Sequence, residues 1–180
     1  MSTVLSPPET TRTVADLLHD LGDVPPSRVL LHPAPGTATE EDVLRLEGAA
    51  DKRLCELIDG VLVEKTMGCT ESVLALAIAE CLRSFVIPRN LGIVSGESGM
   101  VRLFPRIVRI PNVAFVSWER IPEGKMPTWP IPALVPNLAV EVLSLNNTAA
   151  EMSLKLQHYF SAGVQLVWLV EPELRTVSVY

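Results

Sequence analysis

Three polar residues of this chain could together serve a metal ion and a phosphate: Asn112 and Glu141 offer oxygen ligands, and Lys155 offers a positive charge. Glu141 interrupts the apolar run LAVEVLSL at residues 138–145, which is typical of a strand in the middle of a covered sheet. An unpaired, ionised carboxylate in that setting would cost several kcal/mol. Glu141 therefore needs a partner.

Lys155 is the candidate counter-charge for Glu141. It lies in a predicted helix at residues 149–163. Because Lys155 follows Met152 by three residues and precedes Tyr159 by four, it lies on or beside the apolar face turned to the sheet. For these two residues alone, a structural ion pair is the simpler interpretation, with the ammonium extended to the rim of the sheet.

Asn112 adds a third element. It follows Pro111 and precedes the apolar run VAFV, so it stands at the start of a predicted strand. A polar side chain at a strand end, a carboxylate in a neighbouring strand and a lysine covering both are typical of a metal-assisted phosphodiester-cleaving site. In such a site the acids hold Mg²⁺, and the lysine orients the attacking water or stabilises the transition state.

The elements that would position these residues follow in the order hairpin, helix, several strands, helix, strand, strand. Asp59-Gly60 favours the tight turn of the hairpin. Thr148, with Glu151 three residues later, predicts a capping box at the start of the second helix, which Gly163 would end. This order fits a mixed α/β sheet with flanking helices. The strands are predicted within residues 54–65, 91–105, 106–116, 136–145, 164–170 and 176–180.

The first long helix is predicted within residues 71–88. Its apolar residues surround the helix almost completely, which predicts a buried helix with Cys81 inside. Cys55, Cys69 and Cys81 form no CxxC pair, so we expect reduced thiols.

Residues 1–50 form a proline-rich N-terminal extension, and the main domain is expected at residues 51–180. The extension should contain a short helix ending at Gly22, a short strand around residues 28–32 and a helix capped by Thr39. None of these pieces carries evident chemistry.

The composition argues against a membrane protein and against strong nonspecific DNA binding. The chain is 48% hydrophobic with a mean hydropathy of +0.30, yet no apolar run approaches the roughly 18 residues of a membrane span. We therefore expect a soluble protein with no membrane partner, and a cytoplasmic one because no secretory signal pattern is present. The net charge of −6 disfavours strong nonspecific DNA binding.

Residues 54–180 closely resemble the Uma2 family, restriction endonuclease-like proteins of the PD-(D/E)xK nuclease superfamily. The resemblance is carried by the runs CELIDGVLVEK, RIPNVAFVSWERIP and VPNLAVEVLSLNNTAAEMSLKLQHYFSAGVQLVWLVEPELRTVSVY. It implies a restriction-endonuclease-like α/β core and hydrolysis of DNA with Mg²⁺ or Mn²⁺. Family members usually continue beyond the position of Tyr180, so the domain could be shortened here.

The family pattern has Pro-Asp opening one strand, a Glu in the next and a lysine from the following helix. The resemblance thus implies Asn112 and Glu141 as metal ligands and Lys155 as the catalytic lysine. Glu56 matches an acidic position of the family and could be an auxiliary acid or a water-mediated ligand.

Two departures from the pattern bear on activity. Asn112 replaces the expected Asp, which keeps one oxygen donor and removes a negative charge, so metal affinity should fall unless Glu56 or Glu97 compensates. The His that many members carry near the first long helix is absent, with Thr70, Glu71 and Ser72 in its place.

Three hypotheses therefore stand: a metal-dependent DNA endonuclease impaired by Asn112, a catalytically inactive nuclease fold used for binding or interaction, and a structural ion pair with the function elsewhere. The loop at residues 119–132 could contact substrate through Arg120, Lys125 and Trp129 or act as a plain connector. Nucleases that cut both strands often act as homodimers, and the final strand offers an edge for pairing.

Overall fold

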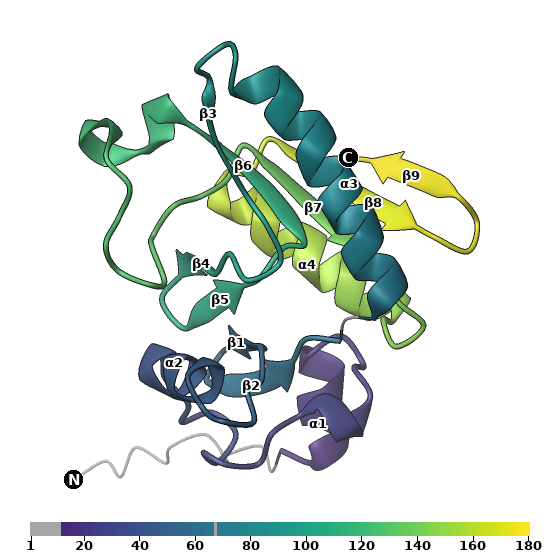
Figure 1. Cartoon of the computed structure of the whole chain (residues 1–180). Coiled ribbons are helices and arrows are strands. Elements are labelled where there is room, and N and C mark those ends of the chain that lie inside the picture. Colours follow the sequence, from purple (N-terminus) through teal and green to yellow (C-terminus); the bar gives the residue numbers. More distant parts are fainter. Residues whose placement is uncertain (1–11, 67) are drawn as a thin grey trace, which may run out of the picture.

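The computed structural model describes residues 12–66 and 68–180 and contains two β-sheets with helices around them (Figure 1). One sheet has the strand order β2-β1-β5-β4, and the other has the order β3-β6-β7-β8-β9. Strands β7 and β8 are parallel, and the other strand pairs are antiparallel. The predicted mixed α/β architecture is therefore confirmed, with two sheets where the sequence indicated one.

The four-stranded sheet comprises β1 (Cys55–Ile58), β2 (Val61–Glu64), β4 (Val101–Phe104) and β5 (Ile107–Arg109). The five-stranded sheet comprises β3 (Gly92–Ser95), β6 (Val113–Ser117), β7 (Leu138–Val142), β8 (Leu166–Glu171) and β9 (Thr176–Val179). The α-helices are α1 (Val14–Asp20), α2 (Glu40–Glu47), α3 (Cys69–Val86) and α4 (Ala149–Ala162). Three short 3₁₀ turns are η1 (Pro26–Arg28), η2 (Trp118–Arg120) and η3 (Pro122–Gly124).

The predicted strand at residues 106–116 is two strands in two different sheets. The chain leaves the four-stranded sheet after Arg109 and enters the five-stranded sheet at Val113. Pro111 lies at the crossing, where it has no N–H to contribute to a continuous ladder. Asn112 is thereby placed at the junction of the two sheets.

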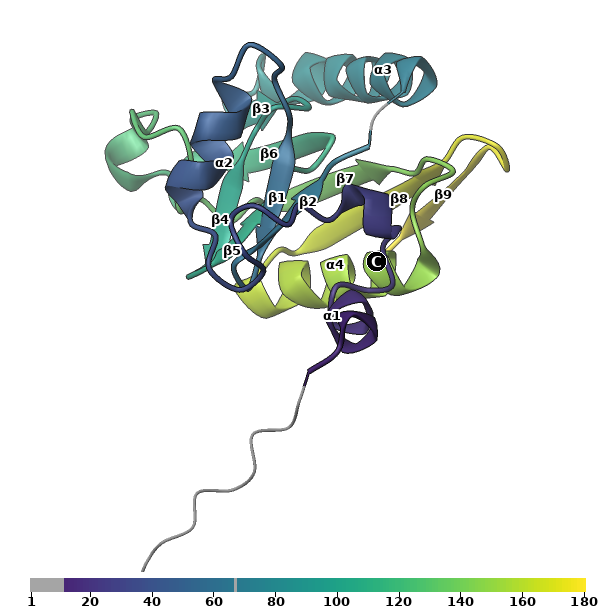
Figure 2. The same ribbon diagram turned by 90° about the horizontal axis from the view of Figure 1, so that it is seen from below.

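Helices α3 and α4 cover opposite faces of the five-stranded sheet (Figure 2). Leu74, Ile78 and Leu82 of α3 pack in one core cluster with Val140 of β7. Met152 and Tyr159 of α4 pack in another, together with Ala139 of β7 and buried residues of β1, β2, β4 and β5. Helix α4 therefore lies where the two sheets meet.

The prediction that α3 is buried is wrong. Val73 and Leu76 are more than half exposed, as is Phe85, and only Ala75 and Val86 are buried. Cys81 is also exposed, because it lies on the side turned away from the sheet. Apolar residues all round a helix do not ensure burial: α3 packs on the sheet with one face, and its other apolar residues stay exposed.

Several local predictions are confirmed. Strands β1 and β2 form an antiparallel hairpin, and Asp59 and Gly60 at its turn have positive φ angles of 49° and 79°. Thr39 caps α2, and Gly163 ends α4 in the left-handed region. The capping box at Thr148 is only half formed. Its side chain accepts from Glu151 N, while the Glu151 carboxylate pairs with Arg28.

The N-terminal part of the chain packs into the same core. Leu21 and Val24 are buried in the cluster that contains Tyr159 of α4. The strand predicted around residues 28–32 is reduced to one isolated bridge between Val29 and Val63. Within residues 12–66 and 68–180, no helix is both long and apolar enough to cross a membrane.

Candidate functional site

Glu141 and Asn112 face each other across β7 and the start of β6. Because Val113 pairs with Val140 in antiparallel register, Asn112 stands opposite Glu141, with both side chains on the α4 side of the sheet. Asn112 N–H donates to Val140 O at 2.9 Å, and Asn112 Oδ1 accepts from Val142 N–H at 3.0 Å. Both residues are buried. The two predicted ligand positions are therefore adjacent.

Lys155 joins Glu141 to Glu56. Its Nζ lies 3.1 Å from Glu141 Oε2 and 3.1 Å from Glu56 Oε1. Glu141 belongs to β7 and Glu56 to β1, so one ammonium on α4 connects the two sheets. All three side chains are at least 96% buried. The predicted pairing of Lys155 with Glu141 is present, and Glu56 shares it.

Each oxygen of Glu141 and Glu56 has a donor. Tyr159 OH donates to Glu141 Oε1 at 2.6 Å. Arg109 Nη1 donates to Glu56 Oε2 at 2.7 Å, and Ile110 N–H donates to Glu56 Oε1 at 3.1 Å. The carboxylates are thus held by internal partners, which is how a folded protein satisfies buried charge.

Four residues of this cluster were missed by the sequence argument: Lys65, Arg109, His158 and Tyr159. Tyr159 falls on the predicted apolar face of its helix, and Arg109 falls within the strand predicted at residues 106–116. A charged residue inside the run RIVRI was a usable signal, because an arginine buried in a strand needs an acidic partner. His158 follows Lys155 by three residues in the same predicted helix, so its spacing was also a usable signal. The proximity of Lys65 left no local signal, because Lys65 follows β2 in the other sheet.

Two further basic residues, His158 and Lys65, contact the residues that surround Glu56 and Asn112. His158 Nδ1 lies 2.8 Å from Arg109 Nη2, so the ring nitrogen accepts from the guanidinium. Lys65 Nζ donates to the Ile110 carbonyl, next to Pro111 and Asn112. Lys65 also lines a cavity of about 420 Å³ together with Thr66, Ser144 and the acidic residues Glu64 and Glu71, among others.

Burial and neighbouring charges shift several pKa values in this cluster. Burial alone would raise the pKa of Glu56, but Lys155 and Arg109 outweigh it and hold that pKa below its ordinary value. Burial opposes the charged form of Lys155 too, yet Glu141 and Glu56 raise its pKa. The Glu56–Lys155 pair is therefore ionised at neutral pH.

In three other residues around the cluster, burial shifts the pKa toward the uncharged form. Burial lowers the pKa of Lys65 to about 8, although Glu141 attracts its charge. Burial, together with the charge of Arg109, lowers the pKa of His158 to about 4, so its ring is neutral at pH 7. Burial and the adjacent Glu141 raise the pKa of Tyr159 well above its ordinary value, so its hydroxyl remains a donor.

This donor set, as arranged, does not fit a divalent cation. Asn112 Oδ1 already accepts from Val142 N–H, and an uncharged amide oxygen adds no negative charge to offset a dication. The charges of Glu56 and Glu141 are balanced by Lys155 and Arg109, two against two, so no negative excess remains. Among the described residues, no group of three His, Cys, Asp or Glu side chains could hold a metal ion.

Three further polar or aromatic residues lie outside this network: Glu97, Ser144 and Trp129. Glu97 Oε2 accepts from Ser72 Oγ at 3.2 Å, and its other oxygen is buried with no partner among the described residues. Ser144 contacts Thr66 and Asn147 in the loop after β7. Trp129 is exposed. No contact in the described part of the chain joins these residues to Lys155.

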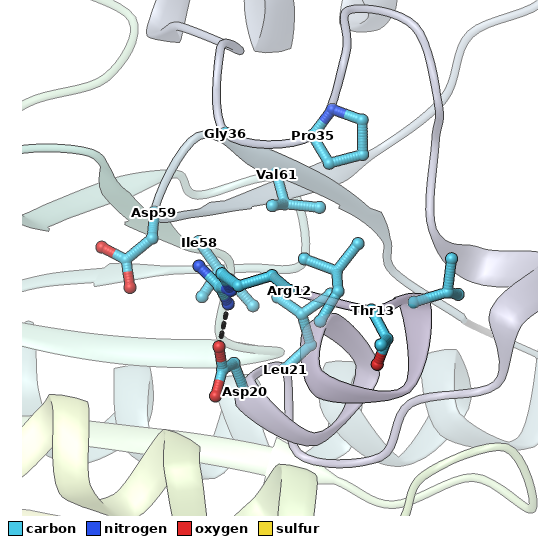
Figure 3. Close-up of a pocket in the computed structure, with 11 residues that line it drawn as sticks. Arg12, Thr13, Asp20, Leu21, Pro35, Gly36, Ile58, Asp59 and Val61 are labelled. Carbon is cyan, nitrogen blue, oxygen red and sulfur yellow. Dashed lines mark hydrogen bonds and ion pairs between the residues drawn. The ribbon is translucent and has the colours of Figure 1, made fainter. Parts of the chain in front are cut away.

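A second cavity lies at the N-terminal helix and is separate from the cluster. It has a volume of about 550 Å³ and is bounded by α1 and by Ile58, Asp59 and Val61 around the hairpin turn (Figure 3). Arg12 and Asp20 form an ion pair at its side. None of Glu56, Asn112, Glu141 and Lys155 is among its lining residues.

Comparisons with known proteins agree with the fold. The family model described as "Uma2: Putative restriction endonuclease" matches residues 40–180. A crystal structure described as "a putative nuclease belonging to DUF820", from Anabaena variabilis ATCC 29413, is similar with a TM-score of 0.65 and 23% sequence identity. The similarity covers 79% of this chain and 78% of that chain. No curated protein matches. The predicted family and the nuclease-like fold are confirmed.

Proposed function

This chain belongs to the Uma2 family of restriction endonuclease-like proteins, and we propose that its buried cluster is the active site of a metal-dependent endonuclease for phosphodiester bonds in DNA, impaired by Asn112. The observation that carries the proposal is the convergence of Glu56, Asn112, Glu141 and Lys155. They come from β1, the start of β6, β7 and α4, and they meet at the junction of two sheets. A structural ion pair between Lys155 and Glu141 alone would not need the other two.

In this proposal the side chains have distinct roles. With an aspartate at position 112, Glu141 and residue 112 would hold Mg²⁺ or Mn²⁺, which would polarise the phosphate when bound; the amide of Asn112 weakens this ligand set. Lys155 orients the attacking water and balances the charge of the phosphate. Glu56 acts as an auxiliary acid that holds Lys155 in place through its Oε1.

The charge count explains how one substitution could impair the site. With Asn112, two carboxylates face two cations, and Lys65 adds a third cation nearby. An aspartate at position 112 could accept from Val142 N–H with one oxygen and offer the second oxygen to a metal ion. It would also add one negative charge. Asn112→Asp is therefore the substitution expected to restore the site.

A second candidate function is a catalytically inactive nuclease fold used for binding or interaction. Two observations favour it: every oxygen of Glu56 and Glu141 already has an internal donor, and the cavity beside Lys65 is lined by Glu64 and Glu71. Acidic walls repel a phosphate backbone. This candidate predicts no cleavage under any metal condition.

The deciding experiment compares the chain with Asn112→Asp. Mn²⁺ and Mg²⁺ binding is measured by calorimetry, and cleavage is measured on plasmid DNA and a single-stranded oligonucleotide. We expect Asn112→Asp to bind Mn²⁺ at least about tenfold more tightly and to cleave DNA, because it adds a hard oxygen ligand and a charge. Glu141→Gln in the same background should abolish both.

Asn90→Asp is the matched control, because it adds the same charge in the loop after α3, where Asn90 Oδ1 accepts from Trp118 Nε1. It should change neither metal binding nor cleavage. Weak cleavage by the unmodified chain that Glu141→Gln removes would show that the amide is tolerated. Absence of metal binding and cleavage in both the unmodified chain and Asn112→Asp would favour the inactive module.

Cleavage of both DNA strands would be helped by pairing two copies, and a homodimer is part of the proposal. Among the described residues, strand β9 pairs only with β8, so it lies at the edge of the five-stranded sheet, with Val177 and Val179 exposed. Sedimentation or light scattering of the chain and of Val177→Lys measures this. A dimer that Val177→Lys dissociates would support pairing through β9.

A further inference from the structure

The segment that precedes the family match contacts helix α4 directly. The family model begins at residue 40, whereas Leu21, Val24 and Arg28 are buried parts of the fold. Helix α4 carries Lys155, His158 and Tyr159, three of the residues around the buried carboxylates. Contacts that fix the position of α4 therefore affect the geometry of the buried cluster.

Arg28 is the strongest of these contacts. Its Nη1 and Nη2 donate to the two oxygens of Glu151 at 2.9 and 2.8 Å, which is a bidentate ion pair. Its Nη1 also donates to Asn146 O at 3.1 Å, and its Nε donates to Glu64 O at 2.9 Å. The side chains of Arg28 and Glu151 are 7% and 1% exposed.

These acceptors belong to three segments that carry residues of the site. Glu64 precedes Lys65, Asn146 lies in the loop that follows β7 and Glu141, and Glu151 lies one helical turn before Lys155. The guanidinium thus fixes the end of β2, the loop after β7 and the first turn of α4 relative to one another.

Gly22 provides a second attachment at the same place. Its carbonyl accepts from Thr148 Oγ1 at 2.6 Å, at the N-cap of α4. A Cβ added to Gly22 would lie 2.6 Å from Glu151 Cα, and Gly22 has a φ of +78°. Only glycine therefore allows this backbone to lie against the start of α4.

We infer that Arg28 is a positioning residue for the buried cluster. By fixing the first turn of α4, it sets where Lys155 and Tyr159 stand relative to Glu141, so the site is incomplete without a segment outside the family match. The guanidinium is suited to this because its planar fork holds its donors in fixed directions toward three segments, whereas the compact ammonium of a lysine has no such fork. Only the catalytic consequence rests on the proposed function; the geometric consequence stands without it.

The test uses Arg28→Lys and Arg28→Met in the full chain. The chain has two tyrosines, Tyr159 and the exposed Tyr180, so ¹³C labelling of tyrosine gives two ring signals, and Tyr180→Phe assigns them. We expect both Arg28 variants to shift the Tyr159 signal, because the ring and its hydrogen bond to Glu141 move with α4. In the Asn112→Asp background we expect kcat for DNA cleavage to fall about tenfold or more with little change in KM, because the lysine is displaced.

Arg12→Met is the matched control. It removes an arginine of the same segment whose ion pair with Asp20 is largely exposed, so both the Tyr159 signal and cleavage should be unchanged. If Arg28→Met does not fold, Arg28→Lys decides, because it keeps the charge. A folded Arg28→Lys with an unshifted Tyr159 signal overturns the inference. If Asn112→Asp does not cleave DNA, the proposed function fails, while the tyrosine signals still test the role of Arg28.

Discussion

Glu56 Oε1 and Lys155 Nζ lie 3.1 Å apart, although Glu56 belongs to the four-stranded sheet and Lys155 to the helix that packs on the five-stranded sheet. The same ammonium lies 3.1 Å from Glu141 Oε2. The ammonium of Lys155 thus connects one carboxylate of each sheet. Stability and site geometry consequently depend on the same atoms.

Lys155→Met is expected to destabilise the protein by about 3–5 kcal/mol, because it leaves two buried carboxylates without their shared cation. Urea unfolding monitored by circular dichroism measures the change. Lys125→Met is the control, since Lys125 and its partner Glu123 are exposed, and it should change stability by less than about 0.5 kcal/mol. Equal stability of Lys155→Met and the unmodified chain would contradict an ionised cluster.

Tyr159→Phe tests the hydroxyl that donates to Glu141. It removes a 2.6 Å hydrogen bond to a buried carboxylate and leaves the ring packed in the core. We expect a loss of about 1–3 kcal/mol in the free energy of unfolding. Tyr180→Phe makes the same chemical change at an exposed position and should be neutral. If the two variants were equally stable, the hydroxyl of Tyr159 would not be holding Glu141.

The pH dependence of stability should contain a contribution from His158. Burial, aided by the charge of Arg109, lowers its pKa in the folded chain from 6.5 to about 4, so between these values the unfolded chain binds more protons. The stabilisation is therefore full above pH 6.5 and is lost as the pH falls to 4. We expect about 2 kcal/mol at most, since the ring is partly solvated.

His158→Asn isolates this contribution. The amide oxygen of asparagine can accept from Arg109 Nη2 as the ring nitrogen does, and it does not titrate. The difference in unfolding free energy between the two proteins should therefore change between pH 6.5 and 4 and be constant above pH 7. A difference that is constant over the whole range would rule out proton uptake by His158.

Lys65 should titrate near pH 8. Burial lowers the pKa of its amine from 10.5, so the penalty for its charged form is present below pH 8 and is relieved as the pH rises to 10.5. The chain has four lysines, and NMR of ¹³C-labelled lysine side chains should show one Cε signal with a midpoint near 8. Lys65→Arg should remove that signal. If that signal persists in Lys65→Arg, the low pKa belongs to another lysine.

Local patterns in the sequence determined much of the secondary structure and half of the site. Asp59 and Gly60 turn the hairpin, and Gly163 ends α4, because turn and cap chemistry depends on a few neighbouring residues. The pairing of Glu141 with Lys155 was also predictable, since a strand and the helix that follows it are 14 residues apart. The place of Asn112 at the start of a strand also followed from the sequence, and the family resemblance added Glu56.

The tertiary structure alone decided which charged residues far apart in the sequence form pairs. Arg109 reaches Glu56 across 53 residues, and Arg28 reaches Glu151 across 123. Such pairings depend on how two sheets and α4 pack together, and periodicity carries no information about this. The change of sheet at Pro111 and the exposed face of α3 were not predictable for the same reason. The assembled core, and not local preference, sets which strands pair and which helix faces are covered.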